Sequence, residues 1–286
     1  MRRMIGVLSL GLIAVAGVAA FGLPPGWGAA ALTRQARRPS VVRPEALGLA
    51  SEPFDVEVGD GVRLRGWLVR ATGAARGLLI YFHGAGDNKD AAVGIAARFA
   101  PLGYDVAAYD ARAHGDSTGE LCTYGAVEKH DLGRVLDTLA ARGVAVGRTL
   151  LLGHSMGAAV ALQAAAVEPR VRAVVAVSPF SDLHRAARGI APFFVSDFSL
   201  ERSLRRAESL AHFRVADASP VEAVRTLEIP ILLIHGDHDT KLPPAHSRRI
   251  LAAALHATLM LVPAGHDDAL AGDSTWAAIR AFLEKT

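Results

Sequence analysis

The sequence predicts an α/β protein built on a mostly parallel, eight-stranded sheet with helices on both faces. Two observations carry this prediction. From residue 77 onward, six short apolar runs alternate with segments of helical periodicity, and such runs suit strands buried on both faces. Before them, two runs of alternating side-chain character flank Gly59-Asp60-Gly61, a hairpin signal that adds two more strands.

The elements follow one another along the chain. The expected strands are 54–58, 62–69, 77–82, 104–109, 149–153, 172–178, 230–235 and 258–262. The expected helices are 89–100, 126–141, 156–167, 244–255 and 268–284. Residues 179–228 interrupt the alternation, are rich in arginine and phenylalanine, and are too long for a plain connection. We expect them to form a small, cap-like helical insertion beside or over the sheet.

The first 31 residues are set apart. Residues 4–23 carry no charge, and this 20-residue run is close to a membrane-spanning length and longer than most signal-peptide cores. Small residues at Val18-Ala19-Ala20 and Ala29-Ala30-Ala31 offer cleavage-like positions. We expect a cell-membrane, secreted or periplasmic protein, divided into 1–31 as a signal peptide or N-terminal membrane anchor, 32–53 as a linker and 54–286 as the folded domain.

Composition describes a globular chain with a sizeable core, since 51% of the residues are hydrophobic and 21% are charged. The net charge is only +3, and no basic run or basic-aromatic patch accompanies it, so we expect no nucleic-acid partner. The single cysteine, Cys122, excludes an internal disulfide. It has no partner at metal-ligand spacing, so we expect a small packed residue.

The strongest functional motif is Gly153-His154-Ser155-Met156-Gly157, which lies between an expected buried strand and a helix rich in small residues. This is the G-x-S-x-G pattern of a nucleophile elbow in its strand-turn-helix context. The two glycines remove Cβ atoms where the strand and helix backbones approach each other. We expect Ser155 to be a nucleophile above the carboxyl ends of the strands, at the positive end of a helix dipole.

A serine hydroxyl is a weak nucleophile, so it needs a base, and the base needs an orienting carboxylate. On a sheet of this kind both follow later strands, in the order serine, acid, histidine. His266 follows the last strand, and we expect it to be the base. The preceding strand ends in "IHGDHDTKLP", which offers Asp237 and Asp239. The spacing alone leaves both aspartates open.

Other histidines compete for a role. His235 and His238, together with the aspartates, suggest a metal site, but nothing nearby supplies a closed coordination set. His246 and His256 are rivals for the base, yet they lie in or at the end of an expected helix. We expect both of these to be solvated.

Several motifs together resemble the α/β-hydrolase superfamily over about residues 54–284, especially its exported, single-anchor serine-hydrolase and serine-aminopeptidase-like branch. The motifs are, in order, "YFHGAGDN", "YDARAHGDSTG", "GHSMG", "IPILLIHGDHDTKLP" and "GHDD". The resemblance implies an α/β-hydrolase fold. The family's acid-bearing turn reads G-x-x-D followed by an apolar residue and proline, which Gly236 to Asp239 and Leu242-Pro243 match. The resemblance thus identifies Asp239 as the triad acid, with Asp237 as a turn residue that binds amides.

Acyl transfer also needs hydrogen-bond donors for the oxyanion. One is expected to be the backbone N–H of Met156, the residue after the nucleophile. The other is expected from the loop after strand 77–82, where the family's His-Gly-x pattern points to Ala85, with Gly84 and Gly86 as alternatives.

Further polar residues are expected to be structural. His83 should fix its loop, and Asp267 and Asp268 should cap the final helix. The turn after strand 104–109 resembles one that is usually structural in the family; it contains Arg112, His114, Gly115 and Ser117.

The sequence therefore predicts a serine hydrolase that cleaves a carboxylic ester or related acyl bond of a small-molecule substrate, with no metal or organic cofactor. One alternative is an aminopeptidase-type serine peptidase, which would need acidic side chains of the insertion aimed at a substrate amine. The available acids are Asp182, Asp197, Glu201, Glu208 and Asp217. A second alternative is a non-catalytic binding protein on the same fold.

Overall fold

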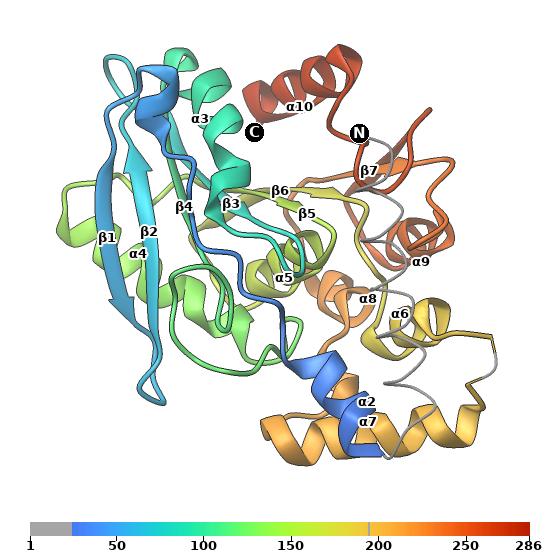
Figure 1. Ribbon diagram of the computed structural model, residues 1–286. Coiled ribbons are helices and arrows are strands. Elements are labelled where there is room, and N and C mark those ends of the chain that lie inside the picture. Colours follow the sequence, from blue (N-terminus) through green and yellow to red (C-terminus); the bar gives the residue numbers. More distant parts are fainter. Residues whose placement is uncertain (1–24, 194) are drawn as a thin grey trace, which may run out of the picture.

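The computed structural model describes residues 25–193 and 195–286. Among these residues, eight strands form one sheet in the order β1-β2-β4-β3-β5-β6-β7-β8 (Figure 1). Strand β2 is antiparallel to both neighbours, and all other adjacent pairs from β4 to β8 are parallel. The strands are β1 Glu52–Glu57, β2 Arg63–Val69, β3 Gly77–Phe82, β4 Tyr104–Tyr109, β5 Thr149–His154, β6 Val171–Val177, β7 Ile231–Gly236 and β8 Ala257–Val262. The predicted mostly parallel, eight-stranded sheet is confirmed.

Helices cover both faces of the sheet. On one face lie α3 (Val93–Phe99) and α10 (Asp273–Lys285), and on the other lie α4 (Asp131–Ala141), α5 (Met156–Ala165) and α9 (Ala245–Ala253). Strand β5 shows why both layers form. Its leucines 150, 151 and 152 are fully buried, with Leu151 in the core beneath α5 and its two neighbours in the core beneath α3. Each buried leucine contributes about 1.5–3 kcal/mol relative to an exposed one.

The chain changes direction between β3 and β5. After β3 it passes through α3 on one face to β4, and after β5 it enters α5 on the opposite face. Loops that leave neighbouring parallel strands toward opposite faces open a crevice at the carboxyl edge of the sheet. Residues 83–88 and Ser155 lie at this crevice.

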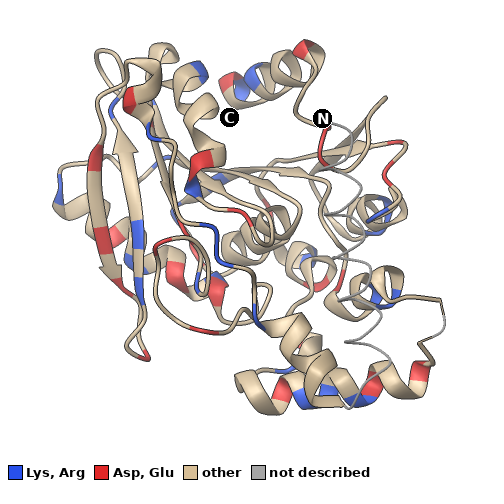
Figure 2. Cartoon of the chain, in the orientation of Figure 1, with Lys and Arg blue, Asp and Glu red and all other residues tan. Residues whose placement is uncertain are grey.

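The insertion is helical, as predicted. It contains α6 (Leu183–Ile190), α7 (Asp197–Ala211) and α8 (Pro220–Ala223). Leu183, Leu200 and Leu204 belong to a third apolar core that lies apart from the two cores of the sheet. Basic and acidic residues both occur along α7 (Figure 2).

The N-terminal segment packs on the insertion. Helix α2 (Pro25–Thr33) contacts α7, and Ala29 is fully buried in the third core. Beyond it, the Asn88 side chain donates to Arg38 O at 3.0 Å, and Asp90 accepts from Val41 N at 2.7 Å. Residues 32–53, expected as a linker, therefore contact the domain.

The signal or anchor predicted for residues 1–31 falls largely on residues 1–24, which lie outside the described residues. Within 25–193 and 195–286, no helix combines the length and apolarity needed to cross a bilayer.

The final helix begins later than predicted. It starts at Asp273 rather than 268, and its N-cap residue is Gly272. The residues before Asp273 form a loop, and Ala269 of this loop is buried in the core beneath α10. The prediction that Asp267 and Asp268 cap this helix was therefore wrong.

Candidate active site

Ser155 sits in a strained turn between β5 and α5. Its backbone has φ 54° and ψ −118°, which non-glycine residues rarely adopt. Its amide donates to Val177 O at 2.8 Å, which ties the turn to β6. A Cβ on Gly153 would lie 2.4 Å from Gly157 O, and a Cβ on Gly157 would lie 2.1 Å from Phe82 O. Only glycine fits at both positions of the elbow.

The structure brings Ser155, His266 and Asp239 together from three loops at the carboxyl edge. His266 Nε2 lies 2.8 Å from Ser155 Oγ, and His266 Nδ1 lies 2.6 Å from Asp239 Oδ2. The histidine and the aspartate are 7% and 3% exposed, so solvent competes little for these hydrogen bonds. A carboxylate accepts only, so Nδ1 carries the proton and Nε2 accepts from the hydroxyl.

Asp239 is held as a carboxylate. Its Oδ1 accepts from Leu242 N at 2.8 Å and Lys241 N at 3.0 Å, and His235 Nε2 lies 3.3 Å from its Oδ2. Burial acts to raise the pKa of Asp239, but the hydrogen bonds from His235, His266 and the Leu242 amide outweigh it. The pKa of this carboxyl is therefore well below its usual range.

Asp237 has a different position. It is exposed and pairs with the exposed His238, whose Nδ1 lies 3.1 Å from Asp237 Oδ1. The turn amides that we expected it to bind are bound by Asp239 instead. His235 is fully buried, with Nε2 donating to Leu242 O at 2.7 Å and Nδ1 accepting from the Ser247 hydroxyl at 2.7 Å. These four histidine and aspartate side chains therefore do not converge on one point.

Of the two rival histidines, His256 is exposed, as expected, but His246 is buried. His246 Nδ1 accepts from Ser181 N at 3.1 Å, and Ser181 Oγ lies 2.9 Å away. Helix α9 thus packs against the start of the insertion, 65 residues away along the chain. The prediction that His246 is solvated was wrong.

The loop after β3 lies beside the nucleophile. A Cβ on Gly84 would lie 3.6 Å from Ser155 Cβ. His83 Nδ1 donates to Gly84 O at 2.8 Å, and its Nε2 accepts from Ala111 N at 2.9 Å, so His83 fixes this loop. Burial lowers the pKa of His83, which keeps the ring neutral for these two roles. Ala85 lines the cavity in front of Ser155.

Met156 begins α5, so the first turn of the helix leaves its amide without an intrahelical acceptor. Its side chain points into the core, where its Sδ lies 3.5 Å from Cys122 Sγ. Cys122 is fully buried, and burial raises the pKa of its thiol well above the usual value. Cys122 is therefore a packed residue.

The turn after β4 carries a network of its own. Arg112 makes two hydrogen bonds of 2.7 Å to the buried Asp131, and Ser117 Oγ donates to Asp110 O at 2.7 Å. His114 is fully buried and donates from Nδ1 to Arg112 O at 2.8 Å. These contacts support the turn.

A cavity of about 580 Å³ opens in front of Ser155 and His266. Its walls come from several parts of the chain, including Arg38 of the N-terminal segment, Asp87 of the loop after β3 and Ile190 of the insertion. Such a cavity is large enough for a small organic substrate.

One group of side chains has metal-ligand geometry. His154, His266 and Asp267 each place one ligand-type atom within 4.8 Å of the others. Both ring nitrogens of His266 already bind Ser155 and Asp239, and His154 Nε2 donates to His266 O at 2.9 Å. A metal ion would have to take His266 away from these partners, so the group fits acyl transfer better than coordination.

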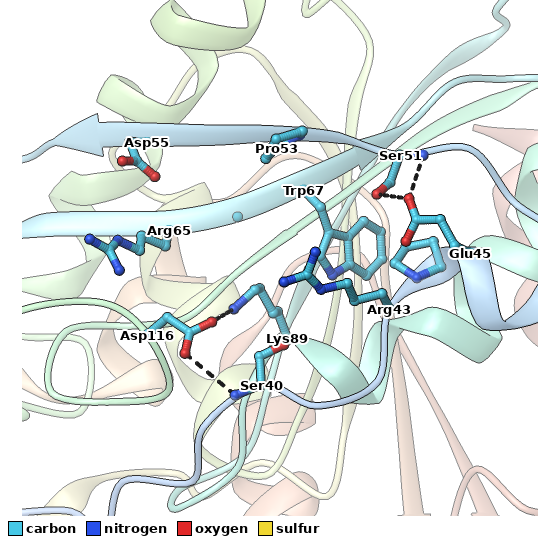
Figure 3. Close-up of a pocket in the computed structure, with 12 residues that line it drawn as sticks. Ser40, Arg43, Glu45, Ser51, Pro53, Asp55, Arg65, Trp67, Lys89 and Asp116 are labelled. Carbon is cyan, nitrogen blue, oxygen red and sulfur yellow. Dashed lines mark hydrogen bonds and ion pairs between the residues drawn. The ribbon is translucent and has the colours of Figure 1, made fainter.

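A second cavity, of about 270 Å³, lies between the N-terminal segment and β2 (Figure 3). Lys89 lines it and pairs with Asp116 at 2.7 Å, while Trp67 is buried along it and has no partner for its indole N–H among the described residues. None of the three predicted triad residues lines this cavity.

Comparison with known proteins gives consistent similarities. A family model described as "Serine aminopeptidase, S33" matches residues 73–226. A protein of Mycobacterium tuberculosis is 31% identical over 238 residues, which cover 81% of this chain and 78% of that relative.

Solved structures share the fold. The Pyrococcus furiosus esterase Pf2001 matches with a TM-score of 0.71 at 22% identity, over 88% of this chain and 98% of that chain. The Pyrococcus horikoshii acylaminoacyl peptidase matches with a TM-score of 0.64 at 14% identity, over 82% of this chain and 41% of that chain. At these identities the likeness concerns the architecture alone.

Proposed function

The chain belongs to the serine aminopeptidase (S33) family of α/β hydrolases, and from this premise we propose that it is a serine hydrolase that cleaves carboxylic esters or related acyl bonds. The observation that carries the proposal is the unbroken hydrogen-bond chain from Ser155 Oγ through His266 to Asp239, with distances of 2.8 and 2.6 Å.

In the proposed reaction, Ser155 Oγ attacks the substrate carbonyl carbon while its proton passes to His266 Nε2. Asp239 stabilises the imidazolium and keeps its Nδ1 proton in place. His266 then gives the proton to the leaving oxygen as the bond between carbonyl carbon and leaving group breaks. A water molecule that His266 deprotonates hydrolyses the acyl-enzyme and regenerates the serine.

The oxyanion that forms in each step needs preorganised donors. We propose the backbone N–H of Met156 as one donor, because it lies at the free end of α5 beside Ser155. The N–H of Ala85 is proposed as the second, since the Gly84–Ala85 loop lies against Ser155 and lines the cavity.

The insertion does not favour an aminoacyl substrate. Among its described residues, Ile190 lines the catalytic cavity, and the acids that line this cavity, Asp87 and Asp267, come from other loops. Of the insertion's acids, Asp197 pairs with Arg188, Asp217 pairs with Arg214, and Glu201 contacts His184. These acids are therefore engaged away from the position that a substrate amine would occupy. A non-catalytic role is disfavoured because a binding protein has no need of the strained elbow and its aligned base.

The test is labelling by a fluorophosphonate probe together with hydrolysis of p-nitrophenyl esters and aminoacyl-p-nitroanilides. We expect ester hydrolysis, with Ser155→Ala abolishing labelling and lowering kcat by roughly 10⁴–10⁶. The exposed Ser274 serves as a control, since Ser274→Ala should change neither. Labelling that survives in Ser155→Ala, or a preference for anilides, would contradict the proposal.

We further propose that residues 1–31 target the chain to or across a membrane, as an anchor or as a cleaved signal. The support comes from the uncharged run of residues 4–23. Ala29 is fully buried against the insertion, and cleavage after Ala31 would remove it. This favours a chain that keeps α2 over one that is cleaved at that site.

A further inference from the structure

Large hydrophobic side chains are exposed at the end of the molecule formed by α2, α6 and α7. The exposed fractions are 63% for Trp27 on α2, 68% for Phe198 on α7 and 56% for Ile190 at the end of α6. Helix α2 packs directly on α7, and Figure 1 shows α6 beside them. Exposed apolar residues that gather on neighbouring elements indicate an interaction surface.

Helix α7 has two different sides. Leu200, Leu204 and Ala207 face the third core, whereas Phe198, Arg202, Arg205 and Arg206 are exposed. The exposed positions recur at helical spacing and form one stripe. The guanidinium of Arg202 lies 5.6 Å from the centre of the Phe198 ring. The outer side of α7 therefore combines an aromatic ring with three positive charges.

These guanidinium groups are not held in ion pairs, although α7 also carries Asp197, Glu201 and Glu208. Among the described residues, no carboxylate lies within ion-pair distance of Arg202, Arg205 or Arg206. The nearest acids on the same helix have other partners, since Glu201 contacts His184 and Glu208 accepts from Val215 N at 2.8 Å. Figure 2 shows basic and acidic residues along α7.

We propose that the outer sides of α2 and α7, with Trp27, Phe198 and the three arginines, form a face that docks on an anionic lipid bilayer. Aromatic rings at headgroup depth and arginines beside anionic headgroups are the chemistry of such contacts. The position of α2 supports this occupant over another protein, because residues 4–23 form the uncharged run and α2 begins two residues later. Through α7, this face adds a contact with the bilayer to the one proposed for residues 1–31.

Helix α6, which contacts α7, reaches the catalytic cavity through Ile190. Ile190 both lines this cavity and is exposed at the end of α6. A bilayer against α2 and α7 therefore brings lipid to the rim of the pocket. The substrate class that follows, which rests on the proposed serine hydrolase function, is an ester carried in the membrane with its apolar part entering past Ile190.

The docking is tested with the full-length protein in vesicles by placing a fluorophore on a single introduced cysteine. Phe198→Cys puts it on α7, and Ala140→Cys puts it on the exposed side of α4 as the control. The native Cys122 is fully buried and should remain unlabelled. In vesicles containing phosphatidylglycerol, we expect quenching by aqueous acrylamide to be about fivefold weaker at position 198 than at 140. Equal quenching at both positions overturns the proposal.

Charge reversal tests the anionic preference. In the labelled Phe198→Cys protein, Arg205→Glu with Arg206→Glu should restore acrylamide quenching, and so should replacing phosphatidylglycerol by phosphatidylcholine. Arg134→Glu with Arg172→Glu changes the net charge equally on exposed sites elsewhere and should leave the protection intact. Protection that persists without vesicles and grows with protein concentration would instead identify a second copy of the chain as the occupant.

The docking proposal and the serine hydrolase proposal are tested by different measurements. Hydrolysis of a soluble p-nitrophenyl ester reports on Ser155, and it should be unchanged by Arg205→Glu with Arg206→Glu. Hydrolysis of an ester embedded in the vesicle should fall about tenfold or more in that variant, since each basic residue near the surface contributes a roughly fivefold gain in binding. A fall of both rates together would show a general loss of function and overturn the docking assignment.

Discussion

His235 and His266 both approach the same oxygen of Asp239, with His235 Nε2 at 3.3 Å and His266 Nδ1 at 2.6 Å from Oδ2. His235 is fully buried, and it is the next-to-last residue of β7, the strand that precedes the loop of Asp239. The acid of the proposed triad is thus supported by a second histidine, which lies away from the substrate cavity.

Replacement of His235 should weaken this support. His235→Leu removes the donor to Leu242 O and Asp239, and we expect it to lower the free energy of unfolding by about 1.5–3 kcal/mol at pH 7. The pKa of Asp239 is lowered in the fold, so its contribution to stability is present above the unfolded pKa of about 3.9 and is lost as pH falls below it. The deficit of the variant, measured by urea unfolding, should therefore shrink toward low pH. His235→Gln retains a donor and should recover part of the loss; an equal deficit at all pH values would contradict the role.

The two aspartates of the turn should differ sharply. Asp239→Asn should lower kcat by about 10⁴, because an amide favours the wrong tautomer of His266. Asp237→Asn changes only an exposed contact with His238 and should have little effect on kcat. Steady-state kinetics on variants of equal thermal stability checks the ranking, and the reverse order would assign the triad acid to Asp237.

The elbow should not tolerate a methyl group. In Gly157→Ala the new Cβ would lie 2.1 Å from Phe82 O, so we expect a loss of about 3 kcal/mol or more in unfolding free energy and a displaced Ser155. Gly94→Ala is the matched control, because a Cβ there meets nothing within 4 Å and alanine favours the helix by up to about 1 kcal/mol. Thermal unfolding of both variants decides; a stable, active Gly157→Ala protein would refute this packing.

His114 should make the protein acid-sensitive. Burial, followed by the neighbouring His83, lowers the pKa of His114 to about 4. A histidine with a lowered folded pKa contributes full stability above its unfolded pKa of about 6.5, and this is lost as pH falls toward 4, by up to about 3 kcal/mol. His114→Asn keeps a donor for Arg112 O without the titration, so its stability should fall less steeply between pH 6.5 and 4. His256 is exposed, so the unfolding free energy of His256→Asn should change with pH as it does in the original protein. The same pH dependence in the original protein and in both variants would exclude His114 as the cause.

The start of the chain should matter for stability. A chain that begins at Pro25 retains α2 on α7 and should hydrolyse soluble esters. A chain that begins at Ala46 should still fold, but it loses α2 and the segment held by Asn88 and Asp90. We expect its Tm to be roughly 4–8 °C lower, equivalent to about 2 kcal/mol. Circular dichroism measures the difference, and identical melting of the two chains would show that the N-terminal contacts contribute nothing.

The sequence predicted every strand to within about two residues, because strands buried on both faces leave unbroken apolar runs. Helix α2 was missed, because residues 1–31 were expected to be a signal peptide or anchor and prolines disfavour the interior of a helix. Proline is compatible with the first helical position, however, because its missing N–H has no intrahelical acceptor there. Pro25 occupies the start of α2 accordingly.

The site was predicted in part. The elbow and the loops after β7 and β8 carry local patterns, so Ser155, Asp239 and His266 could be selected as candidates. The burial of His235 and His246 depends on contacts that no local sequence pattern predicts. His235 contacts Ser247 and Leu242, and His246 contacts Ser181. The available signal for His235 was its place at the end of an apolar strand run, four residues before the candidate acid.

The packing of α2 on α7 limits how the insertion can move. A lid that hinges only at its own two ends swings independently of the rest of the chain, but α7 is also bound to the N-terminal helix. Because Asn88 and Asp90 hold the residues after α2 to the loop beside Ser155, a displacement of α7 pulls on that loop as well. Ile190, at the rim of the cavity, belongs to α6, which contacts α7 in turn. We therefore expect a change in the position of the insertion to be transmitted to the loop that carries Ala85, the proposed oxyanion donor.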